Sequence, residues 1–63
     1  MQLKINGKNE IIDNKNFTVT ELLRLKNINK KVIVELNHKI IEDFSTILKE
    51  GDCLEILYFM GGG

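Results

Sequence analysis

The stretch NFTVTELLRLKN, residues 16–27, is the strongest local structural signal in this chain of 63 residues and decides its fold. Thr18 lies three residues before Glu21. This is the spacing of a capping box, in which each side chain accepts a hydrogen bond from the other residue's free backbone N–H. The spacing predicts a helix that begins at Val19.

The same stretch gives this helix an apolar face. Val19, Leu22 and Leu23 fall on one stripe at helical spacing,. Asparagine tolerates the left-handed conformation that ends many helices, so Asn27 or Asn29 is the expected stop. The helix is therefore short, about two to three turns, and has one side that must be buried against another layer.

Two extended segments precede the helix. Gln2 to Ile5 alternates polar and apolar residues, which is the period of a strand with one buried face,. Asn6-Gly7 follows, a dipeptide that favours the positive φ angles of a tight hairpin turn. The returning strand is predicted around Ile11 and Ile12.

Three extended segments follow the helix. Lys31 to Leu36 is rich in β-branched residues, with Val32, Val34 and Leu36 on one face,. Turns are predicted at Asn37-His38 and at Gly51-Asp52. The other two strands are Lys39 to Ile41 and Cys53 to Phe59, and the irregular connection between them has as its apolar anchors Phe44, Ile47 and Leu48.

This order of elements indicates an α+β domain, with a mixed sheet of about five strands and the single helix packed on one face. Nothing in the chain is then left to cover the other face. If Leu54, Ile56 and Tyr58 of the last strand meet the helix, Leu57 and Phe59 lie on the open face. We expect them to form a partner-docking surface, since exposed apolar patches on small proteins often mark partner sites. The alternative is that loops or edge packing cover them.

Composition excludes several classes of function. With 43% hydrophobic and 29% charged residues the chain reads as a globular domain, and nine Lys and Arg balance nine Asp and Glu without a basic, aromatic-rich patch. Nucleic acid is therefore not an expected partner. No apolar run reaches the roughly 20 residues of a membrane span, and no secretion signal opens the chain, so the cytoplasm is the expected compartment. One cysteine and one histidine are too few for a structural zinc site,.

The sequence closes on Gly61, Gly62 and Gly63, directly after the last predicted strand. We expect residues 1–60 to form the domain and 61–63 a flexible tail. A frayed end and a spacer are the plain alternatives. The third is an arm that enters another protein's active site, because glycines can pass through a slot that any side chain would block. Ordering each glycine costs about 1–2 kcal/mol, so the folded domain must supply the binding affinity.

The reactive group of such an arm is the carboxylate of Gly63. A carboxylate is a poor electrophile until one oxygen becomes a better leaving group, and an ATP-derived adenylate made in a partner enzyme would provide this. The activated acyl group could then accept sulfur, as in a sulfur carrier, or an amine, as in a protein modifier. The arrangement by itself leaves both open.

A resemblance to a known family narrows the choice. The segments LKING, TVTELL, VIVELNHKII and LKEGDCLEIL and the terminal GGG, in this order and over the whole chain, resemble the ThiS sulfur carriers of thiamine biosynthesis. That family belongs to the ubiquitin-like β-grasp proteins. The resemblance implies the same fold here, and its diglycine signature maps onto Gly62 and Gly63, with Gly61 as an additional glycine.

The resemblance also implies a reaction sequence and partners. Gly63 would be adenylated by a ThiF-type enzyme that uses ATP and magnesium, and a sulfur-donating enzyme would help convert it to a thiocarboxylate. The sulfur would then pass to a ThiG-type thiazole synthase. On this interpretation the chain binds no cofactor or metal itself and is a substrate of its partners, not an enzyme.

Three alternatives remain open. The small subunit of molybdopterin synthase shares the fold and the diglycine, although those chains tend to be longer and usually carry a proline before the glycines, whereas this sequence has none. A protein modifier or a carrier for another pathway would share the same tail. A purely structural β-grasp interaction module would keep its function without Gly62 and Gly63.

Other chemically capable residues have plainer interpretations. Cys53 opens a strand, where a free cysteine usually behaves as a small buried hydrophobe. His38 falls in a predicted turn and is expected to be exposed. Four acidic residues could form a rim for a basic partner or could simply be solvated: Glu42, Asp43, Glu50 and Asp52.

Overall fold

The computed structural model describes residues 1–58 of the chain. Within them lie five strands and one helix, in the order predicted. The elements are β1 (Gln2–Ile5), β2 (Lys8–Ile11), α1 (Val19–Leu25), β3 (Val32–Leu36), β4 (Lys39–Ile41) and β5 (Cys53–Tyr58).

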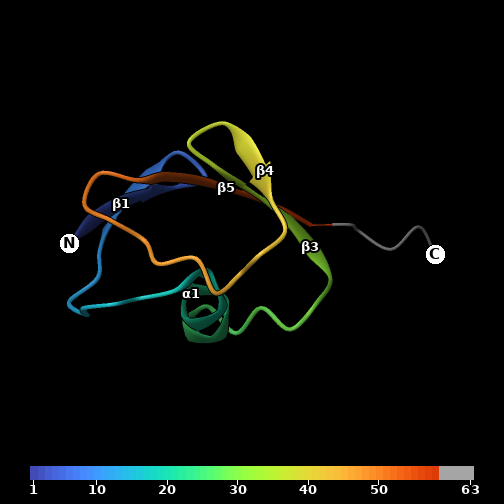
Figure 1. Ribbon diagram of the computed structural model, residues 1–63, viewed down its shortest axis with the longest axis horizontal. Coiled ribbons are helices and arrows are strands. Elements are labelled where there is room, and N and C mark those ends of the chain that lie inside the picture. The colour runs from blue at the N-terminus through green and yellow to red at the C-terminus, as the bar shows by residue number, and fades with distance from the viewer. Residues whose placement is uncertain (59–63) are drawn as a thin grey trace.

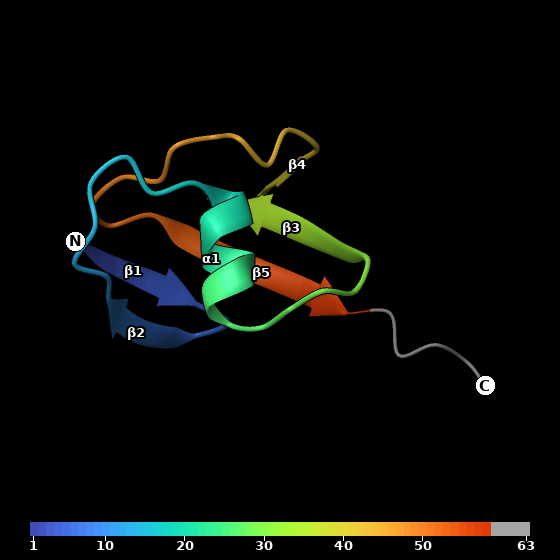
Figure 2. The ribbon, with the colours of Figure 1, turned by 90° about the horizontal axis from the view of Figure 1, so that it is seen from below.

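The five strands form one mixed sheet in the order β2-β1-β5-β3-β4. β1 and β5 run parallel to each other, and the other three pairs are antiparallel. Figure 1 shows the sheet edge-on with α1 on one side of it, and Figure 2, seen from the helix side, shows α1 in front of the middle of the sheet. The α+β prediction and the β-grasp arrangement are therefore confirmed.

The helix begins where the sequence predicts. The backbone N–H of Glu21 donates to the Thr18 hydroxyl at 3.2 Å, and the backbone N–H of Thr18 donates to Glu21 Oε1 at 3.0 Å, which completes the capping box. At the other end Asn27 has a φ of 57°. Ile28 N–H donates to Leu23 O and Asn27 N–H to Arg24 O, the two bonds of a Schellman motif, so the first predicted stop is confirmed,.

The hydrophobic core lies between α1 and one face of the sheet. It includes the predicted helix stripe and the inward residues of the three central strands, with contributions from the segments that flank them. The buried residues are Leu3, Ile5, Ile12, Phe17, Val19, Leu22, Leu23, Val34, Leu48, Leu54 and Ile56.

Ile47 and Tyr58 are more exposed than the sequence suggests. Ile47 was expected to anchor the 42–52 connection but is 50% exposed, because it bridges Thr18 in extended backbone and its neighbour Leu48 takes the inward position,. Tyr58 was placed with the core residues of the last strand. It is 46% exposed, because it pairs with Val32 at the end of β3, where the core ends. Phe44 packs against the core but is only partly buried.

Both hairpin turns lie where the sequence predicts them, and the turn at Asn6-Gly7 has the predicted positive φ angles. Asn6 and Gly7 have φ angles of 50° and 83°, and Asn37 and His38 have 51° and 72°. Positive φ at both central residues is what a type I′ turn requires. Among residues 1–58, no helix has the length and apolar character needed to cross a membrane.

Candidate functional site

Strand β5 is the element that leads to the glycines. It lies in the middle of the sheet, between β1 and β3. Residues 54–58 all pair with β3, whereas only Cys53 and Leu54 pair with β1. β5, which precedes the predicted tail, is thus paired with β3 over residues 54–58 and with β1 only at its first two residues.

Asn6, the residue after β1, extends the contact between β1 and β5. The backbone N–H of Asn6 donates to Leu54 O at 2.9 Å. Ile56 N–H then donates to Asn6 Oδ1 at 2.7 Å, and Asn6 Nδ2 donates to Ile56 O at 3.4 Å. The amide therefore replaces the next backbone rung of the ladder, a role that turn propensity did not reveal.

Asn37, in the other hairpin turn, holds the beginning of β5. Its backbone N–H donates to Cys53 O at 2.7 Å, and its Oδ1 accepts from Cys53 N–H at 3.0 Å. Its Nδ2 donates to Asp52 Oδ1 at 3.1 Å. Two turn asparagines, one from each neighbouring hairpin, thus hold β5 at its first residue and at Ile56 in its middle.

The part of the sheet face opposite α1 that lies over β3, β4 and the second half of β5 carries five residues, which we call the open face: Ile33, Glu35, Ile40, Glu55 and Leu57. Across β3 and β5, Ile33 pairs with Leu57 and Glu35 with Glu55, and Ile40 of β4 pairs with Glu35. Leu57 is 45% exposed. The predicted orientation of Leu57 is confirmed, and its role in docking stays a prediction.

The remaining predicted site residues lie outside the described part of the chain. These are Phe59, proposed for docking, and Gly61, Gly62 and Gly63 of the tail. The boundary between domain and tail at residue 60 lies there too and stays a prediction.

The residues for which the sequence suggests no chemical role are His38, Cys53 and the loop carboxylates. His38 is exposed, as predicted. Cys53 is half-buried instead of buried, since it points to the open side of the sheet beside Lys4. Hydrogen bonds from the hydroxyl and the backbone N–H of Ser45 lower the pKa of Asp43.

Two of the other loop carboxylates, Glu50 and Asp52, also accept hydrogen bonds from the chain itself. Glu50 Oε1 accepts from the backbone N–H of Gln2 at 3.0 Å, and Asp52 Oδ2 accepts from that of Lys49 at 2.8 Å. These bonds shape the loop before β5. Of the described residues, no three His, Cys, Asp or Glu side chains gather into a group that could hold a metal ion.

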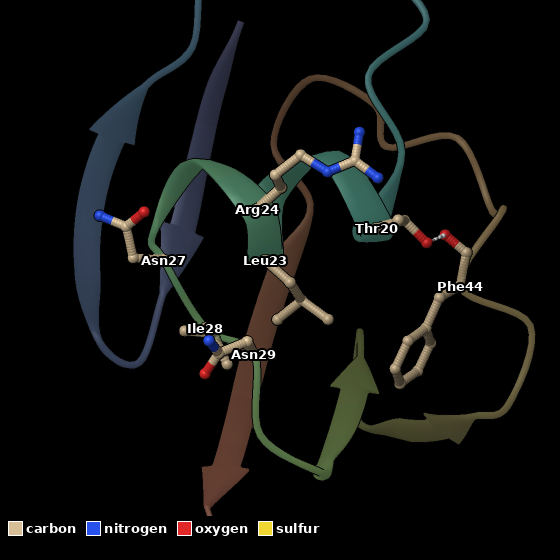
Figure 3. Close-up of a pocket in the computed structure, with 7 residues that line it drawn as sticks. All are labelled: Thr20, Leu23, Arg24, Asn27, Ile28, Asn29 and Phe44. Carbon is tan, nitrogen blue, oxygen red and sulfur yellow. Dashed lines mark hydrogen bonds between the residues drawn. The ribbon is translucent and has the colours of Figure 1, made fainter.

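A hollow of about 370 Å³ lies on the helix side of the molecule. Figure 3 shows Leu23 of α1 and the ring of Phe44 pointing into the space between their segments, with the bond from the Thr20 hydroxyl to Phe44 O closing one end. Arg24 and Asn27 are also among the residues that line it. This hollow and the open face lie on opposite sides of the sheet.

Comparison with known proteins agrees with the geometry. A search of curated proteins finds no match. Among solved structures, the crystal structure of the thiamine biosynthesis protein ThiS from Geobacter metallireducens is similar, with 42% sequence identity, a TM-score of 0.81 and coverage of 100% of both chains. The model of the ThiS family matches residues 2–63, from the first residue of β1 to the last glycine. The chain therefore belongs to the ThiS family.

Proposed function

We propose that this protein is a sulfur carrier for the thiazole branch of thiamine biosynthesis, with the carboxylate of Gly63 as its working group. One observation carries the proposal: the ThiS family model extends over residues 2–63 and so includes the three glycines. The end-to-end similarity to a thiamine biosynthesis ThiS supports the same assignment.

The proposed chemistry takes place in partner enzymes. A ThiF-type adenylyltransferase would use ATP and magnesium to join Gly63 to AMP, with release of pyrophosphate. A sulfur-donating enzyme would supply sulfur at the oxidation level of sulfide, which forms the C–S bond, displaces AMP and leaves a thiocarboxylate. A ThiG-type thiazole synthase would then take that sulfur. The chain binds no cofactor in this scheme and acts as a substrate of each enzyme.

The folded domain has two roles in this proposal. It presents the tail, because β5 is fixed in the sheet by Asn6 and Asn37 and runs toward Gly61 and Gly62, which would enter the partner's active site. It also supplies affinity, because Leu57, together with Phe59, would contact the partner. A contact of this kind is needed to offset the cost of ordering the glycines.

The direct test is intact-mass analysis of the chain after incubation with a ThiF-type enzyme, ATP, magnesium and a sulfur source. We expect the mass to rise by the difference between one sulfur and one oxygen. An unchanged mass with an enzyme that modifies another ThiS protein would refute the proposal.

Two variants make this test specific. A chain that ends at Gly61 should be neither adenylated nor thiolated. A chain with one phenylalanine added after Gly63 should fail in the same way, although it keeps all three glycines, because the acceptor carboxylate is displaced and blocked. Transfer of sulfur from the modified chain to a thiazole synthase, measured beside a molybdopterin synthase large subunit, separates the thiamine pathway from the alternative.

A further inference from the structure

The turn between β1 and β2 holds the one Asn-Gly dipeptide of the chain, Asn6-Gly7. Both residues are exposed, and the space beside Gly7 is open, because a Cβ placed there would meet no atom within 4 Å. Asparagine is a chemically labile residue, since a backbone nitrogen can attack its side-chain amide. A glycine in the next position has no side chain to hinder that attack. Asn6 is therefore a candidate for deamidation.

In the folded chain the amide of Asn6 is engaged by β5. Its Oδ1 accepts from the Ile56 N–H at 2.7 Å, and its Nδ2 donates to Ile56 O at 3.4 Å. Ile56 is buried and belongs to a strand with neighbours on both sides, so it offers a fixed partner. Attack by the nitrogen of Gly7 requires the Asn6 side chain to rotate until Cγ faces that nitrogen. Both bonds to Ile56 oppose the rotation.

The other hairpin turn provides an internal comparison. Asn37 has nearly the same φ as Asn6, 51° against 50°. Its amide is also engaged, because Oδ1 accepts from Cys53 N–H at 3.0 Å and Nδ2 donates to Asp52 Oδ1 at 3.1 Å. The residue after it is His38, whose side chain hinders approach to its own backbone nitrogen,. The two turns thus share a conformation and differ in the residue that carries the attacking nitrogen.

We propose that Asn6 is a site of spontaneous deamidation, and that its bonds to Ile56 confine the reaction to molecules in which β5 has opened locally at Ile56. Local openings of this kind occur in folded proteins without global unfolding. The bonds that hold the middle of β5 and the chemical stability of the turn are then two consequences of one contact. The inference concerns the turn and β5 alone and does not depend on the proposed function.

The reaction consumes only water. The Gly7 nitrogen gives up its proton to solvent and forms a bond to Asn6 Cγ, the bond from Cγ to Nδ2 breaks, and ammonia leaves. The product is a five-membered succinimide ring. Water then adds to one of the two ring carbonyls and opens the ring to aspartate or to isoaspartate. No atom is oxidised or reduced.

The two products differ in what they leave for β5. Aspartate at position 6 keeps an oxygen that can accept from the Ile56 N–H. Isoaspartate carries the main chain through the former side-chain carbonyl, which lengthens the turn by one carbon and leaves a carboxylate on a side group that is one carbon shorter. The isoaspartate form should therefore lose the contact with Ile56 and unfold more easily than the aspartate form.

The test follows deamidation of the full-length chain in mildly alkaline buffer, with and without enough guanidinium chloride to unfold it. Peptide mapping by mass spectrometry locates each converted asparagine, and an isoaspartyl methyltransferase labels isoaspartate. We expect conversion at Asn6 to be about tenfold slower or more in the native chain, because both bonds must break first. In the unfolded chain Asn6 should convert before Asn37. Equal rates at Asn6 in the two conditions, or earlier conversion of another asparagine in the unfolded chain, would overturn the proposal.

Two controls separate the glycine from the contact with β5. Gly7→Asn keeps a residue that tolerates positive φ but adds a side chain, so conversion at Asn6 in the unfolded chain should be slower, and an unchanged rate contradicts the role of Gly7. At guanidinium concentrations below the unfolding transition, amide hydrogen exchange at Ile56 reports local opening. Deamidation at Asn6 should rise in proportion to that exchange. Faster exchange at Ile56 without faster deamidation contradicts the protective role of the contact.

The purified products test the consequence for the fold. Asn6→Asp serves as the standard for the aspartate form, and its Ile56 amide should stay protected from exchange. In the isoaspartate form this amide should exchange faster and the Tm should be lower. Equal protection and equal Tm in the two forms would show that the Asn6 side chain does not hold Ile56.

Discussion

Strand β5 has two faces that differ in almost every physical respect. Leu54 and Ile56 point toward α1 and are buried in the core, whereas Glu55 and Leu57, one position along, point away from it and are exposed. At these two positions the first face is apolar and buried, as folding requires. The second places two carboxylates opposite each other. The difference shows that one side of the strand builds the core, and it agrees with our proposal that the other side serves association.

Truncation of a leucine on each face should give the largest difference in the free energy of unfolding. Leu54→Ala removes a fully buried side chain and should lower the free energy of unfolding by about 2–5 kcal/mol,. Leu57→Ala removes a half-exposed one and should cost less than about 0.5 kcal/mol,. Urea unfolding measures both.

When affinity for the activating enzyme is measured, we expect the opposite order: the substitution at position 57 should have the larger effect. Leu57→Ala should weaken binding to the activating enzyme, because it removes an apolar contact of the open face. If Leu54→Ala leaves too little folded protein, Leu54→Val is a milder change at the same position. Similar stability losses at positions 54 and 57 would show that the two faces are not divided as described.

Much of the buried face could be predicted from the sequence, because its signals are local. The capping box needs only Thr18 and Glu21, and the alternation of β1 and β3 identifies Leu3, Ile5 and Val34 as inward. Where two apolar residues compete, local rules fail: Ile47 and Leu48 are adjacent in extended backbone, so only one can point inward, and the sequence does not say which,.

The contacts that fix β5 could not be predicted in this way. The sequence predicts turns at Asn6 and at Asn37, the first from its tolerance of positive φ, but their side-chain partners lie 50 and 16 residues away. The pairing of Glu35 with Glu55 likewise depends on the strand register, which no sequence pattern specifies. Long-range register is therefore the information that the structure adds to the candidate site.

The next effect concerns Asn6, whose side chain bonds to the middle of β5 at Ile56. Asn6→Gly retains the positive φ but removes both side-chain bonds to Ile56 and should cost about 1–2 kcal/mol in unfolding free energy,. Asn6→Asp is the matched control, because it keeps the acceptor for Ile56 N–H. Amide hydrogen exchange at Ile56 should accelerate only in the glycine variant. Equal exchange in both variants would show that the side chain does not hold the strand.

A smaller effect is expected at the helix that covers the buried face. Thr18→Ala removes the acceptor for the N–H of Glu21 and should cost about 1 kcal/mol,. Thr18→Ser keeps a hydroxyl and should remain close to the unchanged chain. Because the cap lies on the helix side of the sheet, affinity for the activating enzyme should be the same in both variants. A loss of affinity in Thr18→Ala that exceeds its loss of folded protein would place part of the interface on the helix.

The smallest expected effect has the opposite sign and tests the comparison most directly. Removing one charge of a like-charged cross-strand pair should stabilise the free chain, so Glu55→Gln should raise the free energy of unfolding by about 0.2–1 kcal/mol at low salt,. Salt should reduce the gain, because it screens the repulsion in the unchanged chain. Asp13→Asn, measured beside it by urea unfolding, controls for the change in net charge. A gain in stability of Glu55→Gln together with weaker partner binding would show that this face sacrifices stability for association. A loss of stability would mean that Glu55 supports the sheet. The two faces would then differ in exposure alone.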